Sequence, residues 1–185
     1  MIDTIQKDAA DKMQHAVDFV REDMATIRTG RAHPAMFNKI NAEYYGAPTP
    51  LQQLAQFTSP DPRSLLITPF DRSAIGAIEK AIRDSDLGVN PSNDGNSVRV
   101  IVPQLTEERR KEYIKLAKGK AEDARIAVRN VRRHAIDSLK KLQKDGEISE
   151  DELSRAEKSL DGTTRKYVDG IDDLLKHKEA ELLEI

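Results

Sequence analysis

Apolar residues recur every three or four positions along three long stretches of the chain, residues 3–29, 106–146 and 149–185. This is the period of an α-helix with one apolar face, so the pattern predicts three long amphipathic helices. In the first stretch the apolar positions are Ile5, Ala9, Met13, Ala16, Val20, Met24 and Ile27. Glycine can adopt the left-handed conformation that ends a helix, and we therefore expect this helix to end at Thr29 and Gly30.

The second stretch carries signals for both of its helix ends. Thr106 can cap the N-terminus, and Glu107 and Glu108 suit the positive end of the helix dipole. The helix is expected to continue to Gly146, which at 1.5 Å per residue gives a length of about 60 Å. Its apolar face consists of Ala117, Ala121, Ala124, Val128, Val131, Ala135 and Leu142.

The third stretch opens with a capping box, in which the side chains of Ser149 and Glu152 bond each other's backbone N–H groups. Its apolar face consists of Leu153, Ala156, Leu160, Thr164, Tyr167, Ile171, Leu174 and Leu182. Gly162 and Gly170 interrupt the pattern at a cost of about 1 kcal/mol each relative to alanine. We therefore expect this helix to be the least rigid of the three.

The middle of the chain has a different character, because all eight prolines fall between Pro34 and Pro103. Proline excludes long helices there. Short runs with the composition of strands occur instead at residues 39–45, 51–58, 64–68 and 97–102. One short helix is predicted among them, capped by Asp71 and ended by Gly88. Its apolar face would consist of Ile75, Ile78 and Ile82. A turn-rich run at residues 90–95 leads into the last strand, so this part predicts a small α+β domain.

None of the three long helices can bury its apolar face alone, and a short turn joins the last two. We therefore predict a two-domain α+β protein, in which an elongated antiparallel three-helix bundle carries an inserted small, β-rich α/β domain. The predicted bundle consists of residues 1–30 and 105–185, and the inserted domain of residues 31–104. The chain crosses between these domains at residues 29–32 and 103–106, and two such crossings can form a hinge.

The composition favours exposed helices over an enzyme built around one deep pocket. Charged residues make up 34% of the chain, aromatic residues only 4%, and there is no tryptophan. The absence of cysteine excludes disulfides and thiolate metal sites. No apolar run approaches the roughly 18 residues of a membrane span, and the acidic, amphipathic N-terminus lacks the character of a signal peptide. We therefore expect a cytoplasmic protein.

Charge is distributed unevenly along the two C-terminal helices. Residues 106–146 contain thirteen Lys and Arg against seven Asp and Glu, a balance of +6, whereas residues 147–185 contain six against twelve, a balance of −6. The whole chain has a formal charge of only −2. This asymmetry predicts one basic surface on a protein that otherwise repels polyanions.

Four arginines of the second long helix fall within about a third of its circumference. They are Arg125, Arg129, Arg132 and Arg133. The planar fork of arginine suits phosphate, whereas lysine would suffice for solubility. The acidic residue nearest to Arg133 on this helix is Asp137, four residues past it. Arg129 and Arg132 have no acidic residue three or four positions away. The pattern therefore predicts a partner from elsewhere, most simply phosphate; the alternative is a solvated helix face.

Signals for catalysis are weak. The four histidines are dispersed through the chain, at His15, His33, His134 and His177. None has a neighbour that suggests general-base chemistry, and the acidic residues of the third helix lack the spacing of a metal-binding loop. We expect no catalytic residue, no metal site and no cofactor. One of the neighbouring tyrosines Tyr44 and Tyr45 could stack on RNA bases, while the other would face the core.

Several segments together resemble one family. They are Ile27–Ala32 with Pro34, Tyr44–Gly46 followed by Thr49–Leu51, Asp86–Gly88 with Asn90 and Pro91, Leu105–Arg110, Val128–Arg133, and Lys178 with Glu179. In this order, and over the full length of the chain, they are similar to the bacterial ribosome recycling factors. The resemblance implies an L-shaped molecule with a mobile second domain.

The resemblance also implies a function. Such a factor is not an enzyme; it binds the post-termination ribosome mainly through large-subunit ribosomal RNA. With elongation factor G, which uses the GTP, it splits the ribosome into subunits and frees it from messenger RNA, and initiation factor 3 then keeps the small subunit free. The protein itself would be a cytoplasmic monomer without a cofactor or a membrane partner. The alternative is a helical coiled-coil adaptor, or an RNA-binding module without splitting activity.

The family's RNA-contacting arginines correspond to Arg129 and Arg132, with Arg110 as a further candidate. Together with the arginine face, the predicted rRNA-binding residues are Arg110, Arg125, Arg129, Arg132 and Arg133. The predicted hinge residues are Arg28, Thr29, Gly30, Arg31, Ala32, Pro103, Gln104, Leu105 and Thr106.

Overall fold

A computed structural model describes residues 1–184 of the chain. Contacts between residues divide it into two compact units. Unit 1 consists of Met1–Met24 and Ile114–Glu179, and unit 2 of Ala25–Tyr113 with the C-terminal residues from Ala180. Helices and a small antiparallel sheet thus coexist in one chain, which confirms the predicted α+β class. The predicted domain boundaries and hinge stay predictions.

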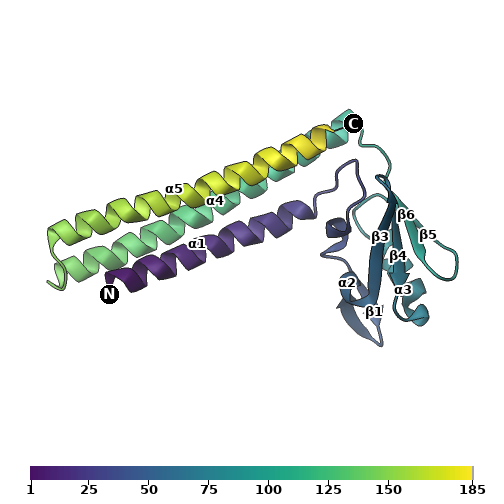
Figure 1. Ribbon diagram of the computed structural model, residues 1–185, viewed down its shortest axis with the longest axis horizontal. Coiled ribbons are helices and arrows are strands. Elements are labelled where there is room, and N and C mark those ends of the chain that lie inside the picture. The colour runs from purple at the N-terminus through teal and green to yellow at the C-terminus, as the bar shows by residue number, and fades with distance from the viewer. Residues whose placement is uncertain (185) are drawn as a thin grey trace. The chain divides into compact units, whose positions relative to one another are not determined.

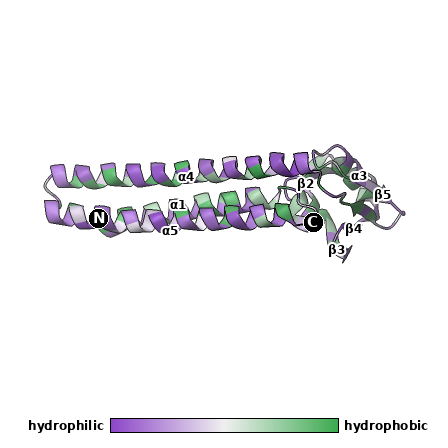
Figure 2. Ribbon diagram, turned by 90° about the horizontal axis from the view of Figure 1, so that it is seen from above, coloured by the Kyte–Doolittle hydropathy of each residue, from purple (hydrophilic) through white to green (hydrophobic). Residues whose placement is uncertain are grey.

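Unit 1 is a bundle of three helices, α1 (Ile2–Ala25), α4 (Glu107–Lys144) and α5 (Glu150–Leu183), each of which extends into unit 2 at one end. The three lie side by side in Figure 1. Figure 2 shows hydrophobic and hydrophilic positions alternating along α4 and α5, as the period predicts. One buried cluster contains Met13, Val17, Val20, Met24, Ala121, Ala124, Val128 and Ile171. A second contains Ala9, Ala135, Leu139, Ala156 and Leu160.

The ends of α4 and α5 confirm the predicted caps. Thr106 Oγ1 accepts the backbone N–H of Arg109 at 3.1 Å. At the other end of α4, Gly146 has a φ of 77° and donates to Gln143 O at 3.0 Å, and Glu147 donates to Leu142 O at 2.9 Å. These are the two bonds of a Schellman motif, which requires the left-handed glycine.

The capping box of α5 is also present. Ser149 Oγ accepts from the backbone of Glu152 at 3.1 Å, and the Glu152 carboxylate accepts from the backbone of Ser149 at 3.2 Å. Two of the N–H groups that every helix start leaves without a partner are thereby satisfied. A short turn of five residues therefore suffices to reverse the chain between α4 and α5.

The predicted end of the first helix is wrong. α1 ends at Ala25, and Gly30 is not among the residues with positive φ. The reason is tertiary: Ile27 and Arg28 are buried in unit 2, and an Arg28 guanidinium nitrogen donates to the carbonyl of Pro103. The helical period continues past Ala25 in the sequence. The chain nevertheless leaves the helix there, and Ile27 and Arg28 become buried.

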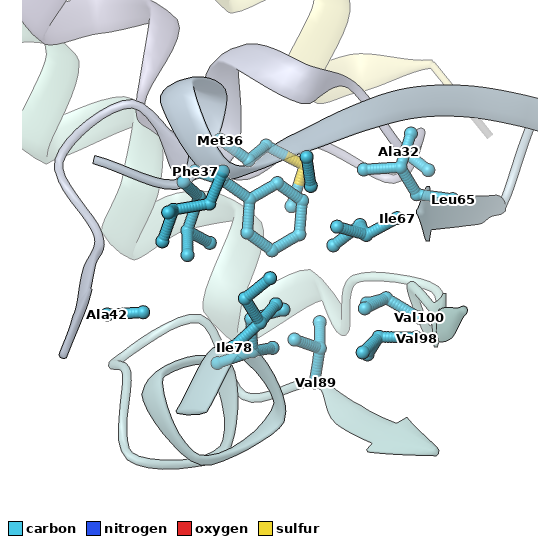
Figure 3. Packing of buried hydrophobic residues seen from close by; sticks show 14 of the residues in the cluster. Ala32, Met36, Phe37, Ala42, Leu65, Ile67, Ile78, Val89, Val98 and Val100 are labelled. Carbon is cyan, nitrogen blue, oxygen red and sulfur yellow. The ribbon is translucent and has the colours of Figure 1, made fainter. Parts of the chain in front are cut away.

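Unit 2 contains a four-stranded antiparallel sheet in the order β3-β4-β6-β5 and a separate two-stranded hairpin, β1-β2. The strands are β1 (Asn41–Tyr44), β2 (Ala47–Pro50), β3 (Ala55–Asp61), β4 (Ser64–Pro69), β5 (Asn90–Asn93) and β6 (Val98–Ile101). The helical elements are η1 (Pro34–Phe37), α2 (Leu51–Leu54), η2 (Arg72–Ala74) and α3 (Ile75–Arg83). In the core the Phe37 ring lies among aliphatic side chains from several of these elements (Figure 3).

Three details of unit 2 differ from the expectation. Residues 51–54 form a helical turn and not the start of a strand, and α3 ends at Arg83, five residues before Gly88. Residues 47–50 and 90–93 are strands that the pattern did not predict. Both contain proline, which cannot donate to a neighbouring strand but is tolerated on an edge, and β5 is an edge strand.

Candidate nucleic-acid interface

The four predicted arginines of the middle of α4 differ strongly in exposure. Arg125 is largely buried, with 17% of its side chain exposed, whereas Arg132 is 39% and Arg129 56% exposed. Arg133 is exposed as well. The helix therefore does bring these residues onto one flank, but it does not present them equally to a partner.

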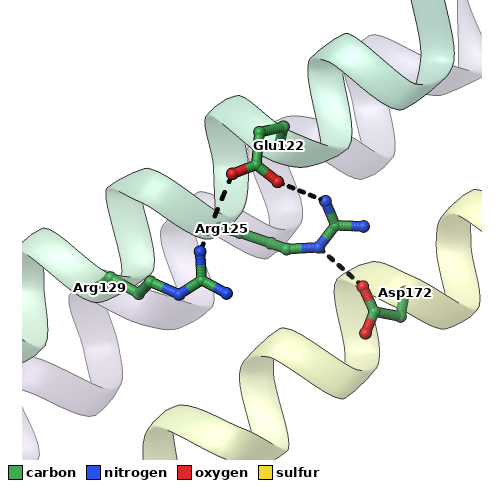
Figure 4. A network of polar contacts seen from close by, with 4 residues as sticks. All are labelled: Glu122, Arg125, Arg129 and Asp172. Atoms are coloured by element: carbon green, nitrogen blue, oxygen red, sulfur yellow. Dashed lines mark hydrogen bonds and ion pairs between the residues drawn. The ribbon is translucent and has the colours of Figure 1, made fainter. Parts of the chain in front are cut away.

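Arg125 is held by carboxylates of the protein itself. Its Nε donates to Asp172 Oδ1 on α5 at 2.8 Å, and its Nη1 donates to Glu122 Oε2 at 2.8 Å (Figure 4). The hydrogen bond to Asp172, and secondarily the contacts with Glu122, raise the pKa of Arg125 above its ordinary value. Both edges of the guanidinium are occupied, so Arg125 fastens α4 to α5.

Arg129 and Arg132 also have acidic neighbours within the protein, although none lies three or four positions away on their own helix. Arg129 Nη1 lies 3.8 Å from Glu122 Oε1, two helical turns away on the same face. Arg132 Nε donates to Asp161 Oδ1 of α5 at 2.6 Å. The acid of this helix that Arg129 contacts is thus Glu122.

These contacts leave donors free. Arginine has five N–H donors, and Arg132 uses only the one on Nε in its bond to Asp161. Arg129 has a single long ion pair, and within residues 1–184 Arg133 forms neither a hydrogen bond nor an ion pair. Arg129, Arg132 and Arg133 therefore present permanent positive charge and unused donors to the surroundings.

Arg110 lies apart from this group. It is fifteen residues before Arg125 on the same helix, a rise of about 22 Å, and it belongs to unit 2. Its Nε is buried and has no hydrogen-bond partner within the described residues. The structure therefore does not bring Arg110 together with the other four predicted arginines.

Sequence reasoning missed the acidic half of this surface, Glu122, Asp161 and Asp172. A signal was present in the acidic excess of residues 147–185 beside the basic excess of residues 106–146. Pairing individual residues across two helices, however, needs the packing of α4 against α5, which a one-dimensional pattern does not specify.

Several of the predicted hinge residues form hydrogen bonds within unit 2. Arg28 reaches the carbonyl of Pro103, and the backbone N–H of Ala32 donates to Pro62 O at 2.8 Å. Thr29 Oγ1 accepts from the backbone of Arg31 at 3.2 Å. The bond from Arg28 to Pro103 thus links the two predicted crossings.

Of the other candidate residues, His33 has a structural role. His33 Nδ1 accepts the backbone N–H of Ala35 at 3.1 Å and so caps η1. Across residues 1–184 the Asp, Glu and His side chains form no cluster of three suited to a metal ion. No helix in the described part of the chain is long and apolar enough to cross a membrane.

The fold and the arginine flank define an α+β protein whose helical bundle presents a cationic surface. The family model described as "Ribosome recycling factor" matches residues 20–183, and the chain belongs to this family. This confirms the resemblance of the sequence segments.

Curated relatives and solved structures agree. The chain is 65% identical to the ribosome-recycling factor of Streptomyces coelicolor over 100% of both chains, and 68% identical to that of Cutibacterium acnes over 98% of both. A solution structure of the ribosome recycling factor matches with a TM-score of 0.80 at 40% identity, covering 100% of this chain and 98% of the other.

A second solved structure contains the Thermus thermophilus factor, described as bound together with Escherichia coli elongation factor G to the Escherichia coli post-termination complex. It matches with a TM-score of 0.72 at 44% identity over 100% of both chains. Both structural matches therefore extend over the small sheet domain as well as the bundle.

Proposed function

We propose that this protein recycles ribosomes. It binds the post-termination ribosome through large-subunit ribosomal RNA and, with elongation factor G and GTP, splits it into subunits and releases it from messenger RNA. The observation that carries the proposal is the group of free arginine donors on α4, Arg129, Arg132 and Arg133, in a chain of this family. The related factor described on the post-termination complex with elongation factor G supports it.

Phosphate is the RNA group that these arginines suit. Duplex RNA has a deep, narrow major groove that side chains cannot read, so the contacts would engage phosphates and folded shape and not sequence. If three phosphates are neutralised, the affinity should fall roughly 20- to 40-fold between 50 and 200 mM salt. Arg125 is left out of this set because its donors serve Asp172 and Glu122.

The energy for splitting would come from the partner. The sequence contains no glycine-rich phosphate loop followed by Lys and Ser or Thr, so GTP is bound and hydrolysed by elongation factor G. This protein acts in the cytoplasm as a monomeric, non-catalytic binding factor, without a cofactor of its own. Initiation factor 3 then holds the small subunit apart.

The predicted hinge would serve the mechanical step. Residues 28–32 and 103–106 would act as the hinge, and a swing about them would transmit the push of the GTPase. Fluorescence energy transfer between one dye on α5 and one on β3 measures this swing. Distances that do not change between free and ribosome-bound protein would remove the swing from the proposal.

Splitting is tested by light scattering of post-termination ribosomes with elongation factor G and GTP. The protein should cause a decay, and Arg132→Glu should slow it at least tenfold, because the variant repels the phosphate that Arg132 attracts. Arg155→Glu is the matched control, since among residues 1–184 Arg155 bonds only to the backbone of its own helix, at Asp151 O.

The two failures have different meanings. A protein that causes no decay would overturn the proposed function. If Arg132→Glu matches Arg155→Glu, with unchanged circular dichroism, the function would stand but the arginine flank would not be its anchor.

A further inference from the structure

Asp161 contacts the arginine on which the proposed function relies, yet a carboxylate is a poor neighbour for a phosphate. Asp161 Oδ1 lies 2.6 Å from Arg132 Nε, and the two side chains are 49% and 39% exposed. The bond is therefore formed at the surface, where RNA would approach. It joins α5 to α4 across 29 residues of sequence.

The geometry of this contact differs from that of Arg125. Arg125 gives one edge to Asp172 and the other to Glu122, and its side chain is 17% exposed. Arg132 gives only Nε to Asp161 and keeps the four N–H groups of its two terminal nitrogens. Arg129 differs again, because its only ion pair is 3.8 Å long. Of the three, Arg132 alone is both fixed in direction and open to a ligand.

We infer that Asp161 is a positioning and specificity residue for RNA binding by Arg132. The carboxylate holds the guanidinium by its Nε and leaves both terminal nitrogens without a bond to it, which lowers the ordering cost when a phosphate binds them. Its negative charge at the same time repels phosphates that approach from any other direction. A correctly placed phosphate of a folded RNA is accepted, whereas the evenly charged backbone of an arbitrary RNA is disfavoured. This inference rests on the proposed function.

Two substitutions separate the two roles of Asp161. Asp161→Asn keeps an oxygen that accepts from Arg132 Nε but removes the charge. Asp161→Ala removes both the acceptor and the charge. Asp173→Asn is the matched control, because Asp173 is exposed on the same helix and makes the same change in net charge. Within residues 1–184 Asp173 has no hydrogen bond or ion pair.

Each variant is measured against two probes, purified large ribosomal subunits and a random-sequence duplex RNA, at one fixed salt concentration. For the duplex RNA, both Asp161 variants should bind about three- to fivefold more tightly than the parent, because a repelling charge is gone. For the large subunits, Asp161→Ala should bind about five- to tenfold more weakly, because Arg132 is no longer held. Asp161→Asn should stay within about twofold of the parent, so the conservative change rescues this loss.

The outcomes separate this inference from the proposed function. If Asp161→Ala matches Asp173→Asn with both probes, while the parent binds large subunits, the inference is overturned and the proposed function stands. Equal loss of subunit binding in Asp161→Asn and Asp161→Ala would also overturn the positioning role. A parent protein that does not bind large subunits would overturn the proposed function and the inference together. Circular dichroism of each variant shows that the helices are retained.

Discussion

Lys120 Nζ lies 2.6 Å from Asp23 Oδ2, in a bond that joins α4 to α1. Both side chains are largely buried, with 24% of Lys120 and 12% of Asp23 exposed. Removing one partner of such a pair leaves the other charge in a poorly hydrated site. The contact therefore fixes how the first helix is held against the second long helix of the bundle.

We expect Lys120→Ala to lower the free energy of unfolding by about 2 kcal/mol, because the charge-assisted hydrogen bond between Lys120 and Asp23 is lost. Urea unfolding followed by circular dichroism measures this change. Lys118→Ala is the control, since Lys118 is exposed on the same helix and should change stability by less than about 0.5 kcal/mol. Equal stability of the two variants would show that the pair contributes nothing.

The arginines of α4 should divide into a structural and a binding class. We expect Arg125→Gln to lower the free energy of unfolding by about 1.5 kcal/mol, because it loses charge-assisted hydrogen bonds to Asp172 and Glu122. Arg129→Gln should leave stability within about 0.5 kcal/mol and lower the slope of log affinity against log salt by roughly 0.7 to 0.9. Denaturation and subunit binding at several salt concentrations test both statements. The reverse assignment of effects would contradict the division.

Tyr44 should titrate late. Its hydroxyl donates to Asp71 Oδ2 at 2.6 Å, and this bond is the main reason why the pKa of Tyr44 is raised to about 12. We expect the ultraviolet signal of its phenolate to appear about two pH units above that of an ordinary tyrosine. In Asp71→Asn the pKa of Tyr44 should fall back towards 10.

The same bond predicts a loss of stability in acid. The pKa of Asp71 is lowered, first by the hydrogen bond from Tyr44 and then by those from Ser73. A lowered carboxyl pKa stabilises the fold above the ordinary value of 3.8, and that stabilisation is lost as the pH falls through the lowered pKa. Tyr44→Phe should therefore be less stable than the parent at pH 7, and the difference should shrink at pH 2–3. A difference in stability between Tyr44→Phe and the parent that stays the same from pH 7 to pH 2–3 would contradict this linkage.

One substitution should have opposite effects at two glycines. Gly146→Ala forces a side chain into a φ of 77° and should destabilise the fold by about 1 kcal/mol. Gly162 lies inside α5, and an added Cβ would meet nothing within 4 Å. Gly162→Ala should therefore stabilise the fold by about 0.5–1 kcal/mol. Thermal unfolding of the two variants against the parent measures both signs.

The features that the sequence predicted well depend on neighbours along the chain. The period of three and four residues identified all three long helices, and the caps at Thr106, Gly146 and Ser149 are local contacts. The family was recognisable for the same reason, since its motifs are short runs. The arginine flank followed from spacing on one helix.

The features that were missed depend on contacts between distant segments. The helical period runs on past Ala25, but the burial of Ile27 and Arg28 against another part of the chain ends α1 earlier. The strand at residues 90–93 becomes possible because an edge position tolerates Pro91. Asp161 and Asp172 reach the arginines only through the packing of α5 on α4. Spacing along the sequence therefore predicted unpaired arginines, whereas in the fold some of them are paired with carboxylates.

The bundle is built from two stretches that leave the translating ribosome at different times. Met1–Met24 is synthesised well before Ile114–Glu179, the stretch against which its apolar residues pack. The core of the sheet-containing part, from Ala32 to Val102, is complete in between. Domains generally fold as units during synthesis, so this core can form while Met13, Val17 and Val20 are still without their partners. The nascent chain thus carries an uncovered apolar helix until residues 114–179 have also been synthesised.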